Sequence, residues 1–195
     1  MAKRGYSVTG FDLSKDQLSR AIENAQKANV KVNFFKQDAR TFNFEEKYDL
    51  IIMLCEGAFP LMETDEMNYT ILQNAYNSLK QNGKFIFTTL NGLFPFFHSV
   101  KDFINSKQEF GNTKKNTFDL MTFREYSEYS FTDDLGNPKT LKCNERYYIP
   151  SEINWLLKSI GFGKTDIFGC IVGKFSRDLQ LDTEHYEMLV IAEKW

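Results

Sequence analysis

The strongest constraint on the fold lies at the start of the chain, where a strand, an acidic residue and a helix follow one another. Residues 6–11 have the composition of a strand, and Asp12 stands directly at its end. Ser14 and Gln17 form a capping-box pair, which predicts that the next helix begins there. This order is typical of the second half of a nucleotide-binding β-α-β unit, in which a carboxylate at the strand end takes both ribose hydroxyls.

The glycine-rich loop of such a unit has no counterpart in the sequence. No G-x-G pattern precedes residue 6, because Met1 falls inside the helix that such a loop would open. The sequence thus indicates a nucleotide-like cofactor without the strand and loop that should hold its charged end.

Strand and helix patterns alternate as far as about residue 91. Residues 48–55 form a continuous apolar run, typical of a strand buried on both faces of a parallel sheet. Beyond it the periodicity predicts a helix over 65–81 and a strand over 84–91. The pattern then changes: residues 118–131 and 139–149 predict an antiparallel hairpin, followed by a helix from Pro150 and two closing strands near 165–170 and 187–193.

Composition excludes several classes of protein. Lys and Arg number 24 against 26 for Asp and Glu, so the net charge of −2 gives no field for nucleic acid or an anionic membrane. The three cysteines lack metal-ligand spacing, which indicates a reducing compartment and predicts no metal site. No apolar run approaches about 18 residues, and the start is not a signal peptide, so we expect a cytoplasmic protein that does not enter the membrane.

Six segments in succession resemble the motifs of class I S-adenosylmethionine-dependent methyltransferases: VTGFDLS, QDAR, YDLIIMLCEGAF, LKQNGKFIFTTLN, YYIPSEINWLLKSIGF and YEMLVIAEK. The resemblance implies an α/β, Rossmann-like fold whose mostly parallel sheet has an antiparallel last strand. It also implies a single domain over residues 1–195, in which residues 94–149 are an inserted hairpin lid that selects the acceptor. The cofactor it implies is S-adenosyl-L-methionine, and the expected function is methyl transfer to a small-molecule acceptor.

The same resemblance implies a set of cofactor-binding residues. Asp12 matches the ribose ligand and Leu13 the residue against the adenine, while Asp38 and Ala39 match the pair that reads the adenine edge. The positions that face the methionine end and the sulfonium are matched by Cys55 and Glu56.

Structural explanations for some of these residues remain open. Asp12 suits a helix N-terminus, Asp38 suits the start of a turn, and Cys55 suits a small buried apolar position. Glu56 directly follows a buried strand, where ligands bind in open α/β sheets, so we take it as a catalytic candidate. His98 is a second catalytic candidate, as a base facing the substrate, with a structural histidine as the alternative.

The predicted hairpin offers candidate acceptor-binding residues. Period-two alternation puts Arg124 and Tyr126 on one face of their strand, and Arg146 and Tyr148 on one face of theirs. These faces suit a small polar or anionic acceptor, or are ordinary solvent-facing surface. A nicotinamide-dependent oxidoreductase is disfavoured by the order of the motifs. A truncated, non-catalytic methyltransferase-like binding or interaction module remains an alternative.

In the family's strand order, the first, central strand of the sheet is missing between residues 6–11 and 48–55. We therefore expect that this chain alone is not a normally stable monomer. Either the natural chain begins upstream, or residues 6–11 pair directly with residues 48–55, or a second copy fills the unpaired sheet interior in a homodimer.

Overall fold

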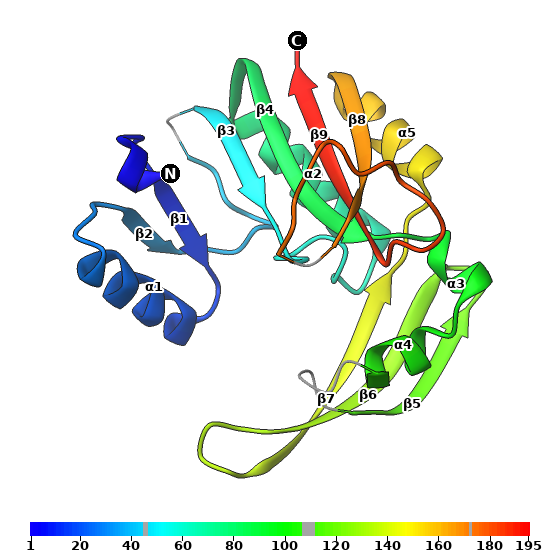
Figure 1. Cartoon of the computed structure of the whole chain (residues 1–195). Helices are drawn as coiled ribbons and strands as arrows, with labels where there is room; N and C mark the ends of the chain where they lie inside the picture. The colour runs from blue at the N-terminus through cyan, green and yellow to red at the C-terminus, as the bar shows by residue number, and fades with distance from the viewer. Residues whose placement is uncertain (45–46, 107–111, 172) are drawn as a thin grey trace. The chain divides into compact units, whose positions relative to one another are not determined.

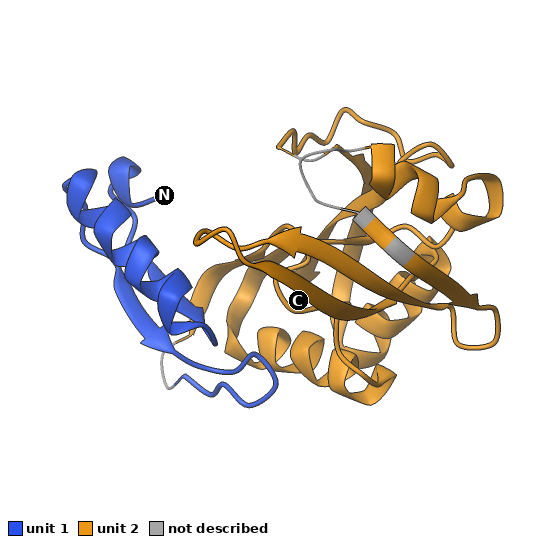
Figure 2. Cartoon of the chain, turned by 90° about the horizontal axis from the view of Figure 1, so that it is seen from below, with its two compact units in different colours: residues 1–45 blue, residues 46–195 orange. Residues whose placement is uncertain are grey.

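The computed structural model describes residues 1–44, 47–106, 112–171 and 173–195. The chain divides into two compact units, Met1–Glu45 and Glu46–Trp195, which Figure 2 colours separately. Each unit is described by itself below.

The first unit is a β-α-β segment. It contains a short 3-10 helix, η1 (Ala2–Arg4), then β1 (Thr9–Asp12), α1 (Lys15–Lys27) and β2 (Asn33–Lys36) (Figure 1). Strands β1 and β2 are parallel, with Asp12 opposite Lys36. The predicted cap of α1 is confirmed, since Ser14 Oγ accepts a hydrogen bond from the Gln17 amide at 3.3 Å. Four phenylalanine rings with centroid distances of 4.9 to 5.8 Å pack together in this unit, of which Phe42 is buried and Phe35 is 47% exposed: Phe11, Phe35, Phe42 and Phe44.

The larger unit is built on a four-stranded sheet. Its strand order is β3 (Tyr48–Met53), β4 (Leu79–Leu90), β9 (Glu187–Lys194) and β8 (Phe162–Cys170). Strands β3 and β4 are parallel, and β9 is antiparallel to both of its neighbours, which confirms the expected antiparallel last strand. Strands β1 and β3, which flank the expected gap, have one hydrogen-bonded neighbour each within the described parts of the chain: β2 and β4 respectively.

Helices α2 (Asp65–Ser78) and α5 (Pro150–Ile160) pack on one face of this sheet (Figure 1). Helix α2 ends three residues before the predicted Gln81, because Leu79 is already extended and Asn82 has a φ of 62°. Gly161 ends α5 as predicted, with a φ of 120° that favours glycine. The apolar core of this unit is formed by side chains from both helices and the sheet: Ile71, Leu72, Phe85, Phe87, Ile153, Leu157 and Val190.

The segment between β4 and α5 forms a second, three-stranded antiparallel sheet. Its strands are β5 (Asn112–Asp119), β6 (Arg124–Thr132) and β7 (Pro138–Arg146), and helices α3 (Phe94–Phe97) and α4 (Val100–Ser106) precede them. The predicted hairpin is confirmed as β6 and β7. The predicted single stretch 118–131 is interrupted by a turn at Phe123, whose φ is 55°, so that β5 becomes an additional strand paired with β6.

Candidate functional site

Two carboxylates stand at the carboxyl edge of the β1–β2 pair. Asp12 is the last residue of β1, and Asp38 follows the end of β2 by two residues. The Ser14 amide donates to Asp12 Oδ1 at 2.7 Å, and the Gln37 amide donates to the Asp12 carbonyl oxygen at 3.1 Å. Asp12 is exposed, and so is 59% of Leu13 beside it. The first unit therefore holds Asp12 in a fixed orientation with one face open to a ligand.

Asp38 is engaged by Arg40 rather than free. The Arg40 guanidinium donates to Asp38 Oδ2 at 2.7 Å from Nη2, and the Arg40 amide donates to Oδ1 at 2.8 Å. These hydrogen bonds from Arg40 hold the pKa of Asp38 below its usual value, so the group is an anion at neutral pH. Ala39 lies half-buried between the two. A ligand amine must therefore share the Asp38 carboxylate with Arg40.

In the larger unit, the turn after β3 contains two consecutive residues with left-handed backbone, Cys55 and Glu56. The φ of Cys55 is 57° and that of Glu56 is 48°, and a non-glycine residue pays about 1 to 3 kcal/mol for such a conformation. The Glu56 amide donates to Thr88 Oγ1 at 3.3 Å, which ties this turn to β4. Strain of this kind persists where surrounding structure enforces it, often at functional sites.

The Glu56 side chain has an unusual environment. Its Oε1 atom is buried and has no hydrogen-bond partner among the described residues. Burial raises the pKa of Glu56 to about 8, and the nearby Glu187 carboxylate adds to the shift. Burial also raises the pKa of the Cys55 thiol, so Cys55 is not a thiolate at neutral pH and is a poor nucleophile. Glu56 is therefore an uncharged acid with one buried oxygen available to a partner.

Further buried carboxyl groups lie in the same unit. Glu125 on β6 faces Glu145 on β7, and burial raises the pKa of Glu145 to about 7, with Glu125 adding to the shift. The Tyr147 hydroxyl donates to Glu125 Oε2 at 2.8 Å and lies 2.9 Å from the Tyr186 hydroxyl. The sequence analysis missed this cluster, although period-two alternation already places Glu125 and Glu145 opposite the face that carries the arginines.

The arginines of that predicted acceptor face are buried and occupied. Arg124 Nη2 donates to Asp65 Oδ1 at 2.6 Å, and Arg146 Nη2 donates to Glu152 Oε1 at 2.7 Å. The Arg146 guanidinium also lies 4.4 Å from the centre of the Tyr148 ring. These contacts fasten β6 and β7 to α2 and α5, so we assign Arg124 and Arg146 to the architecture rather than to acceptor binding.

The two tyrosines of that face differ from each other. Tyr148 is buried, stacks on Phe59 with the ring centres 4.8 Å apart, and accepts a hydrogen bond from Asn68 at 3.3 Å. It belongs to the same structural contacts as the arginines. Tyr126 is 45% exposed, and its side chain lies on that outer face.

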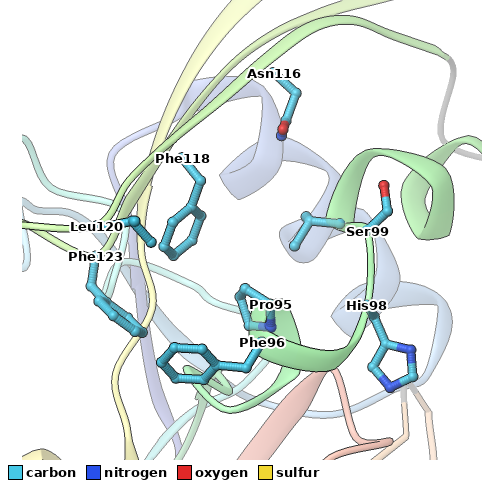
Figure 3. Close-up of a pocket in the computed structure, with 9 residues that line it drawn as sticks. Pro95, Phe96, His98, Ser99, Asn116, Phe118, Leu120 and Phe123 are labelled. Carbon is cyan, nitrogen blue, oxygen red and sulfur yellow. The ribbon is translucent and has the colours of Figure 1, made fainter.

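A cavity of about 230 Å³ lies between α3, α4 and the β5–β6 turn (Figure 3). Its wall is mainly apolar and aromatic, and it is formed by Pro95, Phe96, His98, Ser99, Val100, Asn116, Phe118, Leu120 and Phe123. We call it the aromatic cavity.

His98 lies at the edge of the aromatic cavity. Its ring stacks on Phe94 with the centres 4.4 Å apart, and Nε2 lies 3.2 Å from Glu184 Oε1. In Figure 3 the imidazole points away from Asn116 and Phe118. These partners favour the structural role over that of a base.

The described ranges contain neither a metal-binding group of side chains nor a membrane-spanning helix. In residues 1–44, 47–106, 112–171 and 173–195, no group of His, Cys, Asp and Glu side chains is arranged to hold a metal ion. Over the same residues, no helix has both the length and the apolar character needed to cross a membrane.

Comparison with known proteins identifies relatives of the chain. Residues 1–83 match the family model described as a methyltransferase domain. A protein of Geobacillus sp. (strain WCH70) that is named as a methyltransferase is 31% identical over 87 residues, which are 45% of this chain and 35% of that protein. The ubiquinone biosynthesis O-methyltransferase of Rickettsia bellii (strain OSU 85-389) is 24% identical over 157 residues, 80% of this chain and 62% of that enzyme. The chain thus spans less than two thirds of the length of these relatives.

Solved structures extend the similarity over the whole chain. The CcbJ methyltransferase from Streptomyces caelestis has a TM-score of 0.75 at 16% identity and covers 99% of this chain, which in turn covers 76% of it. An S-adenosylmethionine-dependent methyltransferase from Clostridium acetobutylicum ATCC 824 has a TM-score of 0.70 at 18% identity, with coverages of 99% and 77%. At such identities the similarity establishes the fold.

Proposed function

We propose that this chain, which has the fold of class I S-adenosylmethionine-dependent methyltransferases, takes part in methyl transfer from S-adenosylmethionine to a small-molecule acceptor. The observation that carries the proposal is the placement of Asp12 and Asp38 at one carboxyl edge of the parallel β1–β2 pair. Ligands in open α/β sheets bind at this edge, and two anions there suit the hydroxyls of a ribose and the amine of an adenine.

The first unit would bind the nucleoside part of the cofactor. Asp12, oriented by the Ser14 amide, would accept hydrogen bonds from the ribose hydroxyls, and the exposed Leu13 would lie against the adenine. Asp38 would accept from the exocyclic amine while it keeps the Arg40 ion pair, and the Ala39 backbone would complete the adenine edge.

Methyl transfer from S-adenosylmethionine requires no covalent intermediate with the protein. When bound, S-adenosylmethionine supplies an activated methyl electrophile, so the chain has to align the acceptor and exclude water. Glu56, at the carboxyl end of β3, is the catalytic residue that we propose in the larger unit. With a pKa of about 8, Glu56 is mostly protonated at neutral pH, and its ionised fraction is a stronger base than an ordinary glutamate, which suits proton removal from an amine or a hydroxyl. We do not assign this role to His98, because Glu184 and Phe94 hold its ring.

Calorimetry with S-adenosylhomocysteine, the demethylated product, tests the cofactor site. The Asp12→Asn variant is expected to bind about ten- to hundredfold more weakly than the unchanged chain, because charged hydrogen bonds are lost. Asp16→Asn is the matched control, since Asp16 is an exposed acid in the first turn of α1. Equal affinity of Asp12→Asn would remove Asp12 from the site. No binding by the unchanged chain would favour the alternative of a non-catalytic module.

A further inference from the structure

Three aromatic rings build most of the aromatic cavity. The Phe118 and Phe123 rings meet edge to face with their centres 5.4 Å apart, and Phe96 lies at the same distance from Phe123. Ring faces and edges arranged in this way make favourable contacts with a flat, apolar group. Typical small-molecule pockets have volumes of about 300 Å³ or more. The aromatic cavity, at about 230 Å³, is smaller and therefore suits a ligand with a single ring.

Asn116 supplies the polar end of the aromatic cavity. Figure 3 shows its amide pointing into the cavity, on the side of Phe118 and Ser99. The Asn116 Nδ2 group donates to Glu125 Oε1, so the amide is oriented by that carboxyl group. Within the described residues Asn116 Oδ1 has no partner. Since a carbonyl oxygen can only accept, the ligand group that meets it must be a hydrogen-bond donor.

Two acidic side chains lie behind this amide. Glu125 is fully buried and accepts hydrogen bonds from both Asn116 and the Tyr147 hydroxyl, and Glu145 faces it on β7. Burial raises the pKa of Glu125, whereas its two hydrogen bonds favour the ionised form. None of the nine described residues that form the wall is Lys or Arg. The wall therefore offers the Asn116 oxygen as an acceptor for a ligand amine, and no Lys or Arg to pair with an anion.

Arg124 and Arg146 belong to the other face of the three-stranded sheet. The Arg146 guanidinium lies 5.9 Å from the centre of the Phe123 ring, and its charge is balanced by Asp65 and Glu152. In the β5–β6 pairing, Phe118 is opposite Glu125, whereas Asp119 is opposite Arg124. Successive side chains of a strand point to opposite faces, so Arg124 lies on the face away from Phe118 and Glu125. Arg146 is opposite Arg124 in the β6–β7 pairing and shares that outer face. The two arginines that the sequence favoured as acceptor ligands are thus absent from the wall and paired with carboxylates.

We infer that the aromatic cavity binds the ring of the methyl acceptor and selects a compound that carries an amine over one that carries a carboxylate. The ring packs against Phe96, Phe118 and Phe123, and the amine donates to Asn116 Oδ1, while Glu125 holds the Asn116 amide in place. That the bound compound is the methyl acceptor rests on the proposed function, whereas the binding of an aromatic amine in the cavity rests on the geometry of the cavity alone.

Two probes of similar size test whether the cavity prefers an amine to a carboxylate. Tyramine and 4-hydroxyphenylacetate share a phenol ring and differ in having an ammonium or a carboxylate group. Calorimetry or ligand-detected NMR without any cofactor is expected to show that tyramine binds at least tenfold more tightly. Equal binding, or tighter binding of 4-hydroxyphenylacetate, would overturn the charge selection. Binding of neither probe would overturn the cavity as an acceptor site.

A plugged variant tests the location. Leu120 lies in the wall and is 72% exposed, so Leu120→Trp is expected to fill the mouth of the cavity and abolish tyramine binding without loss of the fold. Leu135→Trp is the control, because Leu135 is 86% exposed in the β6–β7 turn and is absent from the wall. Unchanged tyramine binding by a folded Leu120→Trp variant would place the probe elsewhere and overturn the inference.

The cofactor experiment separates this inference from the proposed function. Tyramine binding by a chain that does not bind S-adenosylhomocysteine would support the cavity and contradict methyl transfer. Binding of S-adenosylhomocysteine without binding of tyramine would support the proposed function and contradict the cavity as the acceptor site.

Discussion

Tyr147 donates a hydrogen bond to Glu125 Oε2 at 2.8 Å, and both side chains are fully buried. Glu125 lies on β6 opposite Phe118, and Tyr147 directly follows β7, with its ring centre 5.6 Å from that of Phe118. The Tyr186 hydroxyl extends the contact toward β9. The hydrogen bond from the Tyr147 hydroxyl thus offsets part of the free energy that burial of the Glu125 carboxyl group costs.

Tyr147→Phe is expected to lower the free energy of unfolding by about 1 to 3 kcal/mol, because it leaves a buried acceptor without its donor. Urea unfolding followed by circular dichroism measures this. Tyr129→Phe is the matched control: its hydroxyl is buried without a partner among the described residues, so its removal should cost almost nothing. An equal loss in both variants would show that packing, and not the hydrogen bond, matters at position 147.

The stability of the larger unit should fall as the pH rises. Glu56 has a pKa raised to about 8, above its ordinary value of 4.5, so the folded state keeps a proton that the unfolded state releases. Its contribution is fully present below about pH 4.5 and is lost as the pH rises to about 8, at up to about 1.4 kcal/mol per pH unit.

Glu56→Gln is expected to remove this part of the pH dependence, which urea unfolding at a series of pH values would measure. Glu63→Gln serves as control, because Glu63 is an exposed glutamate of the same unit. If both variants keep the slope of the unchanged chain, Glu56 is not the titrating group.

Asp65 connects the two buried arginines of the outer face. Its Oδ1 accepts from Arg124 at 2.6 Å and its Oδ2 from Arg146 at 3.3 Å. We expect Asp65→Asn to destabilise the chain by about 1 to 3 kcal/mol, since Arg124 loses its ionic partner while Arg146 keeps Glu152. Asp49→Asn removes the exposed pair with Lys80 and should cost about 1 kcal/mol or less. Thermal unfolding of both variants compares them, and equal losses would contradict the structural role of Asp65.

The hydrogen bonds from Arg40 should set the pKa of Asp38. Arg40→Met removes the hydrogen bonds that keep the pKa of Asp38 low, so this pKa is expected to return toward its ordinary value. An NMR titration of the Asp38 carboxyl carbon measures the shift. The Asp12 signal is the internal comparison, because Asp12 takes its hydrogen bond from Ser14 and not from Arg40. An unmoved Asp38 titration would mean that another contact sets its charge.

Local signals in the sequence determined much of the backbone. The Ser14 cap, the Gly161 stop and the apolar run of β3 each depend on residues a few positions apart, so the elements they mark are confirmed. The expected burial of β3 on both faces is wrong, since Ile52 is 46% exposed. The placement of Asp12 and Asp38 after consecutive parallel strands follows in the same way, since such strands end at the same edge. The end of α2 was predicted too late because the backbone conformations of Leu79 and Asn82 depend on the sheet that β4 joins.

Only the tertiary structure decided which face of the hairpin meets the cavity. Alternation divides β6 and β7 into an arginine face and a glutamate face, and the sequence favoured the arginines as acceptor ligands. Asp65 and Glu152 reverse that choice, because these carboxylates on α2 and α5 neutralise Arg124 and Arg146. Asp65 is 59 and 81 residues from the two arginines, and Glu152 is six residues from Arg146. Burial of an arginine is tolerated only where such partners exist, and the alternation within β6 and β7 does not show which helix side chains reach their arginines.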